Sequence, residues 1–398
     1  MSLKGDLDRI LRRVRGAGFT LRYWDGDTIA YGDGAPEFGL RLPDEATVAW
    51  MLGDALVRLP EAYVAGDLGV DGDLQHLLHL CYRVDDRVLA IGPWRKAALA
   101  LAAFRRRNSL AGAPANVSHH YDIGNEFFAT WLDDDMNYSC AYFEHASDDL
   151  PTAQRQKLRH ICGKLRLQPG DRLLDIGCGW GALARHAATH HGVGVVGITL
   201  SEPQRALGQT RVREHGLADR VELRRQDYRE LGAETFDRVV SVGMIEHVGE
   251  RYLPAYMASV ARGLRPGGIA VLHTMGKTRK APVTPWITKH IFPGMYLPTL
   301  AELSTHMTNA GLRISDVENL RPHYALTIEA WIDRFEKHAD AIARMFDERF
   351  VRMWRMYLHA ARAAFVFGAL NVWQLTCSHG SSDEIPLTRR HLYEAGRG

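Results

Sequence analysis

Length, composition and charge describe an ordinary globular protein and exclude several classes. The 398 residues allow two or three domains; 46% are hydrophobic and 24% are charged. A net charge of +2 gives no bulk attraction to nucleic acid, so we expect no nucleic-acid partner. The longest membrane-like apolar run, residues 97–104, is far shorter than the roughly 20 residues needed to span a bilayer. The N-terminus lacks the apolar core of a signal peptide, and we expect a cytoplasmic protein that is at most peripheral to a membrane.

The cysteines predict free thiols. The five are Cys81, Cys140, Cys162, Cys178 and Cys377. Their number is odd and their spacing matches no zinc-binding pattern, so we expect no bound metal. Free thiols are typical of a reducing cytoplasm.

Residues 1–108 form a region of their own. Its predicted elements are strands at 21–24, 28–31 and 39–42 and helices at 44–59, 74–81 and 93–107. The last helix carries basic residues at both ends, which fits either a solvated helix end or contact with anionic lipid headgroups. Residues 109–117 are small and include a proline, so they are predicted to be a linker.

From about residue 152 the chain alternates between strands and helices. The predicted strands are 172–176, 194–198, 221–224, 236–242 and 269–273, and the predicted helices are 152–165, 182–189, 205–215 and 253–264. This alternation predicts a parallel, doubly wound sheet that binds ligands beyond the carboxyl ends of its strands. Five polar residues fall there and indicate a site: Asp175, Thr199, Asp227, Glu246 and His273.

Two other segments are expected to border this site. A helix ending at Trp131, capped by Asp122 or Asn125, precedes an aromatic-rich segment around Tyr138. After residue 277 the alternation stops, and long helices precede a last strand at 372–377. A helical insertion at the carboxyl edge is well placed to cover the site and shape a substrate pocket.

The strand at 172–176 leads into a glycine-rich turn, GCGWG at 177–181, and then into a helix. Alternate glycines let the backbone approach a ligand, and the free N–H groups of the helix point at it. A dinucleotide turn fits this spacing but needs an acid about 20 residues on, whereas the second strand ends in ITLS at 198–201. With Asp175 at the first strand end, the turn also resembles the first motif of class I methyltransferases, which bind S-adenosylmethionine. A tight turn without a ligand is the third alternative.

Motifs along the chain resemble those of the cyclopropane-fatty-acyl-phospholipid synthases, a branch of the class I methyltransferases that includes the mycolic acid cyclopropane synthases. The motifs, numbered at their first residues, are HYDIGNEFF at 120, MNYSCAYFE at 136, LLDIGCGWG at 173, GITLSEPQ at 197, QDYREL at 226, SVGMIEHVG at 241, LHTMG at 272, ITKHIFPGMYLP at 287 and HYALTIEAW at 323. Together they cover the chain from about residue 118 onward, and their combination and order are highly specific.

The resemblance implies an α/β protein with a doubly wound, Rossmann-like class I methyltransferase sheet, a helical insertion at about 277–368 and a smaller α+β N-terminal domain. Residues 1–108 look like the N-terminal domain of the phospholipid-acting members and would associate with lipid or membrane. Residues 118–398 would form the catalytic domain, peripheral to the inner face of the membrane. Relatives are often dimers, so a homodimer is compatible with the resemblance.

The implied reaction transfers the methyl group of S-adenosylmethionine to a cis alkene in the acyl chain of an unsaturated phospholipid. It leaves a carbocation, and a cyclopropane ring closes when a base removes a proton. In this family the base is thought to be bound bicarbonate, whose ligands here would be Cys140, Glu246, His273 and Tyr324 with shared protons. The implied cofactor contacts, with two strand-end acids, are Tyr138, Ser139, Asp175, Gly177, Cys178, Gly179, Thr199, Leu200, Ser201, Gln204, Asp227, Tyr228, Arg229 and Val242.

One position departs from the family. Many members have a cysteine where this chain has Ala361, which excludes a nucleophilic role there. The alternatives within the class are an acyl-chain methyltransferase that makes a methyl branch or a methylene group, and a small-amine N-methyltransferase. Outside it, the chain would be a lapsed lipid-binding protein or, more distantly, an NAD-dependent oxidoreductase. The presence of Cys140, Glu246 and His273 argues against the lapsed form.

Overall fold

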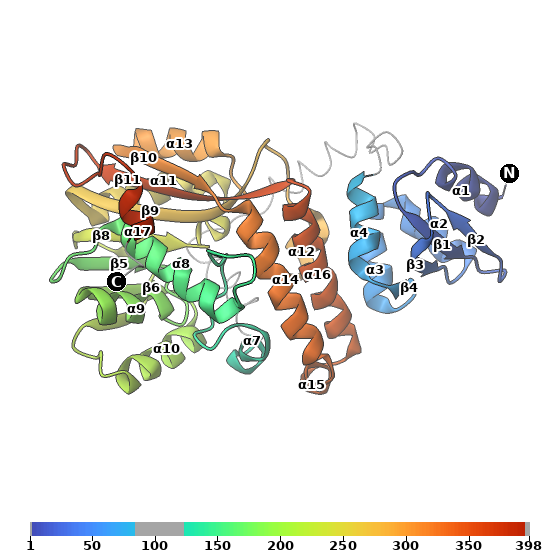
Figure 1. The fold of residues 1–398 in the computed structure, drawn as a ribbon, viewed down its shortest axis with the longest axis horizontal. Coiled ribbons are helices and arrows are strands. Elements are labelled where there is room, and N and C mark those ends of the chain that lie inside the picture. Colours follow the sequence, from blue (N-terminus) through green and yellow to red (C-terminus); the bar gives the residue numbers. More distant parts are fainter. Residues whose placement is uncertain (1, 84–122, 395–398) are drawn as a thin grey trace. The chain divides into compact units, whose positions relative to one another are not determined.

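A computed structural model describes residues 2–83 and 123–394 (Figure 1). The chain divides into two compact units, each built from separate stretches of sequence. The first unit comprises Met1–Arg105, Pro282–Ile291 and Trp331–Phe367, and the second comprises Arg106–Ala281, Phe292–Ala330 and Gly368–Gly398. Much of the helical insertion expected at 277–368 therefore belongs with the N-terminal residues. The basic helix predicted at 93–107 and the linker predicted at 109–117 lie outside the described residues.

The first unit contains a four-stranded sheet in the order β2-β1-β3-β4. The predicted hairpin is confirmed, because β1 (Gly18–Arg22) and β2 (Thr28–Tyr31) pair antiparallel. β3 (Pro36–Arg41) lies parallel to β1, and β4 (Gly69–Gly72) lies antiparallel to β3. Phe19 and Leu21 point to the same face of β1 and are buried in the core of the unit, while Thr20 between them is half-buried.

Helices pack around this sheet and around one another. They are α1 (Leu3–Leu11), α2 (Glu45–Gly53), α3 (Ala55–Ala65), α4 (Leu74–Arg83), α12 (Pro285–His290), α15 (Ala339–Met345) and α16 (Glu348–Val366). The single helix predicted at 44–59 is wrong, because Asp54 (φ −152°, ψ 76°) separates α2 from α3. Glu61 on α3 accepts hydrogen bonds from Lys289 and His290 of α12, each at 2.7 Å. Segments far apart in sequence are thus joined within the unit.

The second unit contains a seven-stranded sheet in the order β10-β11-β9-β8-β5-β6-β7. Its strands are β5 (Arg172–Ile176), β6 (Gly194–Thr199), β7 (Val221–Arg225), β8 (Phe236–Val242), β9 (Leu264–Lys277), β10 (Leu312–Asn319) and β11 (Leu370–His379). β5 to β9 are parallel, as predicted, but β11 runs antiparallel to β9 and β10 runs antiparallel to β11. The other five strands are joined by helical crossovers, which return the chain to the same edge and so make neighbouring strands parallel. β10 and β11 come after this strand–helix alternation has ended, so they are free to run antiparallel.

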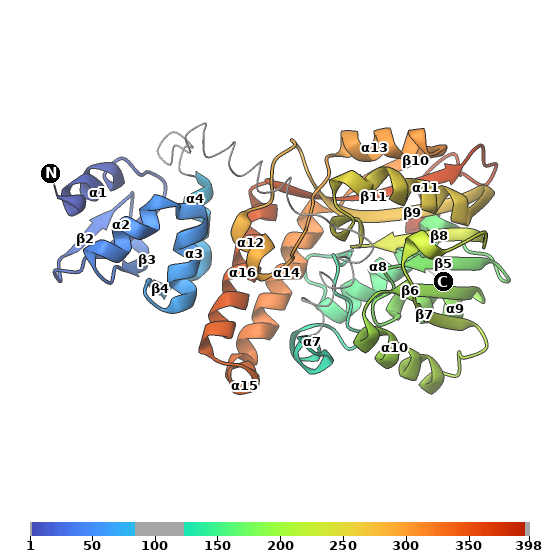
Figure 2. The same cartoon turned by 180° about the vertical axis from the view of Figure 1, so that it is seen from behind.

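Helices cover both faces of this sheet (Figure 1 and Figure 2). The helices on these faces include α8 (Leu150–Leu165), α9 (Ala182–His191), α10 (Glu202–Glu214), α11 (Leu253–Gly263) and α13 (Leu300–Asn309). The unit also contains α7 (Asn125–Trp131), α17 (Arg390–Glu394) and the start of α14 (Arg321–Lys337). Successive side chains of β5 separate the faces: Leu173 packs with α8 and α9, and Leu174 packs with α11 and α13. Within the described residues, no helix combines the length and apolar character needed to cross a bilayer.

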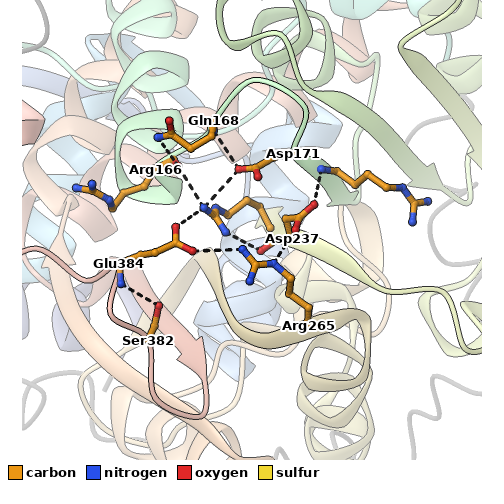
Figure 3. A network of polar contacts seen from close by, with 9 residues as sticks. Arg166, Gln168, Asp171, Asp237, Arg265, Ser382 and Glu384 are labelled. Atoms are coloured by element: carbon orange, nitrogen blue, oxygen red, sulfur yellow. Dashed lines mark hydrogen bonds and ion pairs between the residues drawn. The ribbon is translucent and has the colours of Figure 1, made fainter.

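An ionic network ties the C-terminal segment to the amino ends of β5, β8 and β9 (Figure 3). The buried guanidinium of Arg238 pairs with Asp171 at 3.4 Å and with Glu384. Arg265 donates to Asp237 at 2.6 Å and to Glu384 at 3.2 Å. These charges stabilise the amino edge of the sheet, while the loops at the carboxyl edge supply the walls of a cavity.

Candidate functional site

The cavity lies where the strand order of the large sheet reverses. β6 and β7 follow on one side of β5, and β8 and β9 lie on the other. The loops after β5, β6, β7 and β8 line the cavity, together with residues 136–139 and part of α8. This is the position at which doubly wound sheets bind ligands.

The structure brings together nearly all the residues expected to contact the cofactor. The cavity is lined by Tyr138, Ser139, Asp175, Gly177, Cys178, Gly179, Thr199, Leu200, Gln204, Asp227, Tyr228, Arg229 and Val242. Ser201 is not part of this wall; its side chain instead accepts a hydrogen bond from the backbone N–H of Gln204 at 3.4 Å and caps α10. Ser201 therefore acts on the shape of the wall through the helix that it caps.

The glycine turn after β5 has a backbone that only glycine adopts easily. Gly177 and Gly179 have φ values of 85° and 55°. A Cβ added at Gly177 would lie 2.9 Å from the Cβ of Met244, whereas one added at Gly179 would meet no heavy atom within 4 Å. Gly177 therefore permits close packing of two loops, and Gly179 leaves open space beside the cavity.

Short polar groups and one ion pair shape the far side of the wall. After β6, the Thr199 hydroxyl donates to Gln204 Oε1 at 3.1 Å, and both side chains are buried. After β7, Arg229 donates two hydrogen bonds to the Asp227 carboxylate, from Nε at 2.8 Å and from a terminal nitrogen at 2.7 Å. Such a bidentate pair fixes both side chains, so this loop presents a preformed surface to a ligand.

A buried lysine faces the cavity opposite Asp175. Lys157 on α8 is 3% exposed and donates to Asn137 Oδ1 at 3.0 Å and to Ser139 Oγ at 3.1 Å. Burial lowers the pKa of Lys157 to about 8 and raises the pKa of Asp175 to about 7. Asp175 Oδ2 is buried and forms no hydrogen bond with any described residue.

Sequence reasoning missed Lys157 and several other residues of the wall. The missed residues include Met136, Asn137, Lys157, Trp180, Gln226, Met244 and His247. One signal was present, because Lys157 lies one turn from Gln154 and Ile161 on the buried stripe of α8. A lysine within a buried helical stripe needs partners and is a candidate for function.

The four predicted catalytic residues are buried but are not among the described residues of the cavity wall. Glu246 follows β8, in a turn whose neighbours Met244 and His247 do line the cavity. Its Oε1 accepts from the Met275 N–H at 2.5 Å, while its Oε2 forms no hydrogen bond with the described residues. Burial raises the pKa of Glu246 to about 7, so the carboxyl exchanges its proton near neutral pH.

His273 lies on β9 opposite Val242 of the wall. Gln374 Nε2 lies 3.1 Å from its Nδ1, and because an amide nitrogen donates, Nδ1 accepts and the ring proton is on Nε2. Burial lowers the pKa of His273 to about 3, so the ring is neutral at physiological pH. Nε2–H is therefore a donor available to an anion.

Cys140 and Tyr324 meet at one backbone carbonyl. The Cys140 sulfur lies 3.3 Å from the carbonyl oxygen of Ala141 and 3.8 Å from that of Leu320, and the Tyr324 N–H donates to the Leu320 oxygen at 3.1 Å. Cys140 directly follows Ser139 of the wall, and burial raises the pKa of its thiol. The structure thus joins Glu246 to β9 and Cys140 to Tyr324 through different backbone groups.

Comparison with known proteins extends these observations. The family model described as mycolic acid cyclopropane synthetase matches residues 109–375, and a model for a domain of unknown function matches residues 7–91. A probable fatty acid methyltransferase from Pseudomonas putida is 35% identical over 383 residues, which cover 94% of this chain and 95% of that protein. The cyclopropane-fatty-acyl-phospholipid synthase of Escherichia coli (strain K12) is 43% identical over 271 residues, 68% of this chain and 69% of that protein.

A solved structure agrees with the fold. The crystal structure of a mycolic acid cyclopropane synthase complexed with SAH and CTAB has a TM-score of 0.64 and 33% sequence identity. It covers 67% of this chain and 98% of that chain.

The open space at Gly179 predicts a specific loss of ligand binding. Gly179→Val should weaken S-adenosylhomocysteine binding by roughly 100-fold or more, since a branched side chain would fill the approach to the turn. Gly216→Val is the matched control, because Gly216 is exposed, has a φ of 66°, and a Cβ added there would meet no heavy atom within 4 Å. Calorimetry should show near-normal binding in the control. Equal loss in both variants would attribute the effect to backbone strain.

Proposed function

Because the chain belongs to the mycolic acid cyclopropane synthetase family, we propose that it forms cyclopropane rings on unsaturated phospholipid acyl chains. It is an S-adenosylmethionine-dependent methyltransferase related to enzymes that modify lipid acyl chains. The observation that carries the proposal is the buried Glu246 directly behind the cavity wall, with one carboxylate oxygen held by Met275 and the other without a partner among the described residues.

The charges beside the glycine turn suit the amino acid end of S-adenosylmethionine, which carries an ammonium and a carboxylate. Lys157 uses two of its three N–H donors on Asn137 and Ser139 and keeps one for a ligand carboxylate. Asp175 Oδ2 is an acceptor for a ligand ammonium. In this orientation the adenosine extends over the turn toward the loops after β6 and β7.

Lys157→Met should therefore weaken S-adenosylhomocysteine binding by roughly 10- to 100-fold, the loss of one hydrogen bond to a charged group. Binding of 5′-methylthioadenosine, which lacks the amino acid end, should hardly change. Lys164→Met is the control, because Lys164 is also buried on α8 but pairs with Glu318 and does not line the cavity. If Lys157→Met weakens both ligands equally, Lys157 only maintains the wall.

The proposed reaction has two requirements: the alkene must be positioned against the methyl group, and a base must then remove a proton. The alkene is a weak nucleophile, so holding it in line with the methyl group supplies much of the rate. The alkene electron pair forms the new C–C bond as the C–S bond breaks, leaving S-adenosylhomocysteine and a carbocation. Loss of a proton from the added methyl group releases the electron pair that closes the ring. Apolar walls would exclude the water that could otherwise trap the cation as an alcohol.

The residues behind the wall fit the bicarbonate ion that the family resemblance implies. Glu246 Oε2 can accept the hydroxyl proton of that ion, and His273 Nε2–H can donate to one of its oxygens. Cys140 and Tyr324 would add further contacts. When bound, the anion would supply the proton acceptor and a negative charge near the carbocation. The protons would be shared between Glu246 and its partners, since the pKa of Glu246 lies at about 7.

Glu246→Gln tests this assignment. An amide keeps an acceptor for the Met275 N–H but places a donor where bicarbonate would need an acceptor. Turnover should fall by roughly 10²- to 10⁴-fold while S-adenosylhomocysteine still binds. Added bicarbonate should raise the turnover of the wild-type enzyme in carbonate-depleted buffer but leave the variant unchanged. Glu222→Gln, at an exposed ion pair on β7, is the control.

Full wild-type activity in depleted buffer would contradict the assignment, as would a normal bicarbonate response in Glu246→Gln.

A methyl branch or a methylene group is the alternative product. The observation that favours it is the P. putida relative, named a probable fatty acid methyltransferase and matched over nearly the whole chain. Ala361, where many family members have cysteine, lies on α16 in the first unit and is not part of the cavity wall among the described residues.

We further propose that the first unit brings the enzyme to a phospholipid surface. Trp50, Leu52 and Leu56, where α2 meets α3, are each more than 40% exposed. Arg58 reaches the same place, donating to the Trp50 carbonyl at 2.9 Å with its guanidinium 5.2 Å from the Trp50 ring. An apolar patch beside a cation suits the headgroup region of a bilayer.

The double variant Trp50→Ser/Leu52→Ser should lower turnover on phospholipid vesicles by roughly tenfold or more, because each large apolar side chain contributes about 1.5–3 kcal/mol when fully buried. Its affinity for S-adenosylhomocysteine should not change. Leu387→Ser, at an exposed position of the second unit, is the control. Unchanged vesicle binding in a cosedimentation assay would remove this patch from the membrane proposal.

A further inference from the structure

A cluster of one cysteine and two histidines lies between α8 and α9, apart from the cavity wall. Cys162 on α8 and His186 and His191 on α9 place one ligand atom each within 4.8 Å of one another. Cys162 is fully buried, and both histidines are half-buried. We propose that these three side chains bind a divalent transition-metal ion, with Zn²⁺ the best match to their donor atoms.

The ligand atoms are available for coordination. None of the three side chains forms a hydrogen bond with another described residue. A neutral imidazole offers the lone pair of one ring nitrogen to a metal ion. The Cys162 thiol gives its proton to solvent as the sulfur bonds to the metal, since the thiolate is the ligand.

The three ligand atoms and the helices that carry them indicate which metal ion would bind. One sulfur and two imidazole nitrogens suit Zn²⁺, which takes four tetrahedral ligands at about 2.0–2.3 Å. Ligand atoms in such a site lie about 3.3–3.7 Å apart, so small side-chain rotations close the cluster. His191 is the last residue of α9, where the helix dipole favours a positive charge. Water or His190, whose ring centroid lies 4.4 Å from that of His186, can fill the fourth position.

Because the cluster lies between two helices that support the cavity wall, the proposed ion would have a structural role. Leu158 and Leu183 line the cavity, and they lie about one helical turn before Cys162 and His186. A metal bound here would join α8 to α9 and hold both helices behind the wall. Because the ligands come from two helices, their spacing along the chain resembles no zinc motif, which is why sequence reasoning predicted no metal.

Cobalt titration of the full chain tests the site, since Co²⁺ substitutes for Zn²⁺ and its bond to a thiolate gives a charge-transfer absorption band. Wild-type protein stripped of metal should bind one Co²⁺ with this band, and Zn²⁺ should displace it. His191→Gln should lose most of the affinity and, at a half-exposed helix end, should leave the fold intact. Cys162→Ser should lose the thiolate band. Cys377→Ala, a buried cysteine outside the cluster, should behave as wild type.

Thermal melting provides a second readout. Zn²⁺ in excess should raise the midpoint of unfolding of the wild type and of Cys377→Ala, because a ligand that binds only the folded chain stabilises it. The shift should vanish in His191→Gln. The proposal is overturned if the wild type gives no thiolate band, or if Cys162→Ser or His191→Gln binds Co²⁺ as the wild type does.

Discussion

The close approach of two loops at Gly177 is the constraint on which the site depends. A Cβ at this position would collide with Met244, and the backbone needs a φ of 85°. Only with both conditions met can the chain turn sharply from β5 into α9 while the loop after β8 packs beside it. The carboxyl ends of β5 and β8 then form the crevice where the strand order reverses, and the cavity lies over that crevice.

Burial around this crevice raises the pKa values of carboxyl groups and lowers those of basic side chains. The pKa values of Asp175 and Glu246 rise to about 7, while those of Lys157 and His273 fall to about 8 and about 3. Near neutral pH, three of these groups lie close to proton exchange and the histidine is neutral. Strongly shifted pKa values of this kind cluster at functional sites, so the crevice is where we place the proposed chemistry.

Local patterns predicted most of the second unit. The bounds of β5, β7 and β8 match the prediction to within one residue, because β5 and β8 are rich in apolar residues and β7 alternates apolar and charged residues at its start. The residues that the family resemblance implied as cofactor contacts line the cavity, with Ser201 as the exception. The reversed direction of β10 and β11 follows from long-range pairing that no local pattern records. The same is true of the first unit, which joins residues 282–291 and 331–367 to the N-terminal residues.

The roles of buried polar side chains were hardest to predict. Lys157 was missed, since a single lysine in a helix is ordinary until its burial and its partners Asn137 and Ser139 are seen. Glu246 follows β8 as expected, whereas β9 continues past His273 to Lys277, and the structure places both residues behind the wall. Whether a strand-end residue faces a cavity or supports its wall depends on packing by neighbouring loops, which sequence spacing does not encode.

The most direct test of the central claim is mass spectrometry of lipids from cells that express the protein, before and after mild hydrogenation. Our account predicts phospholipid acyl chains that gain one CH₂ and then take up no hydrogen, as a cyclopropane ring requires. A product that gains one CH₂ and still takes up hydrogen would be a methylene or an unsaturated branched chain. A gain of one CH₂ with two more hydrogens would be a saturated methyl branch. Either result, or unchanged lipids from an enzyme that binds S-adenosylmethionine, would contradict the account.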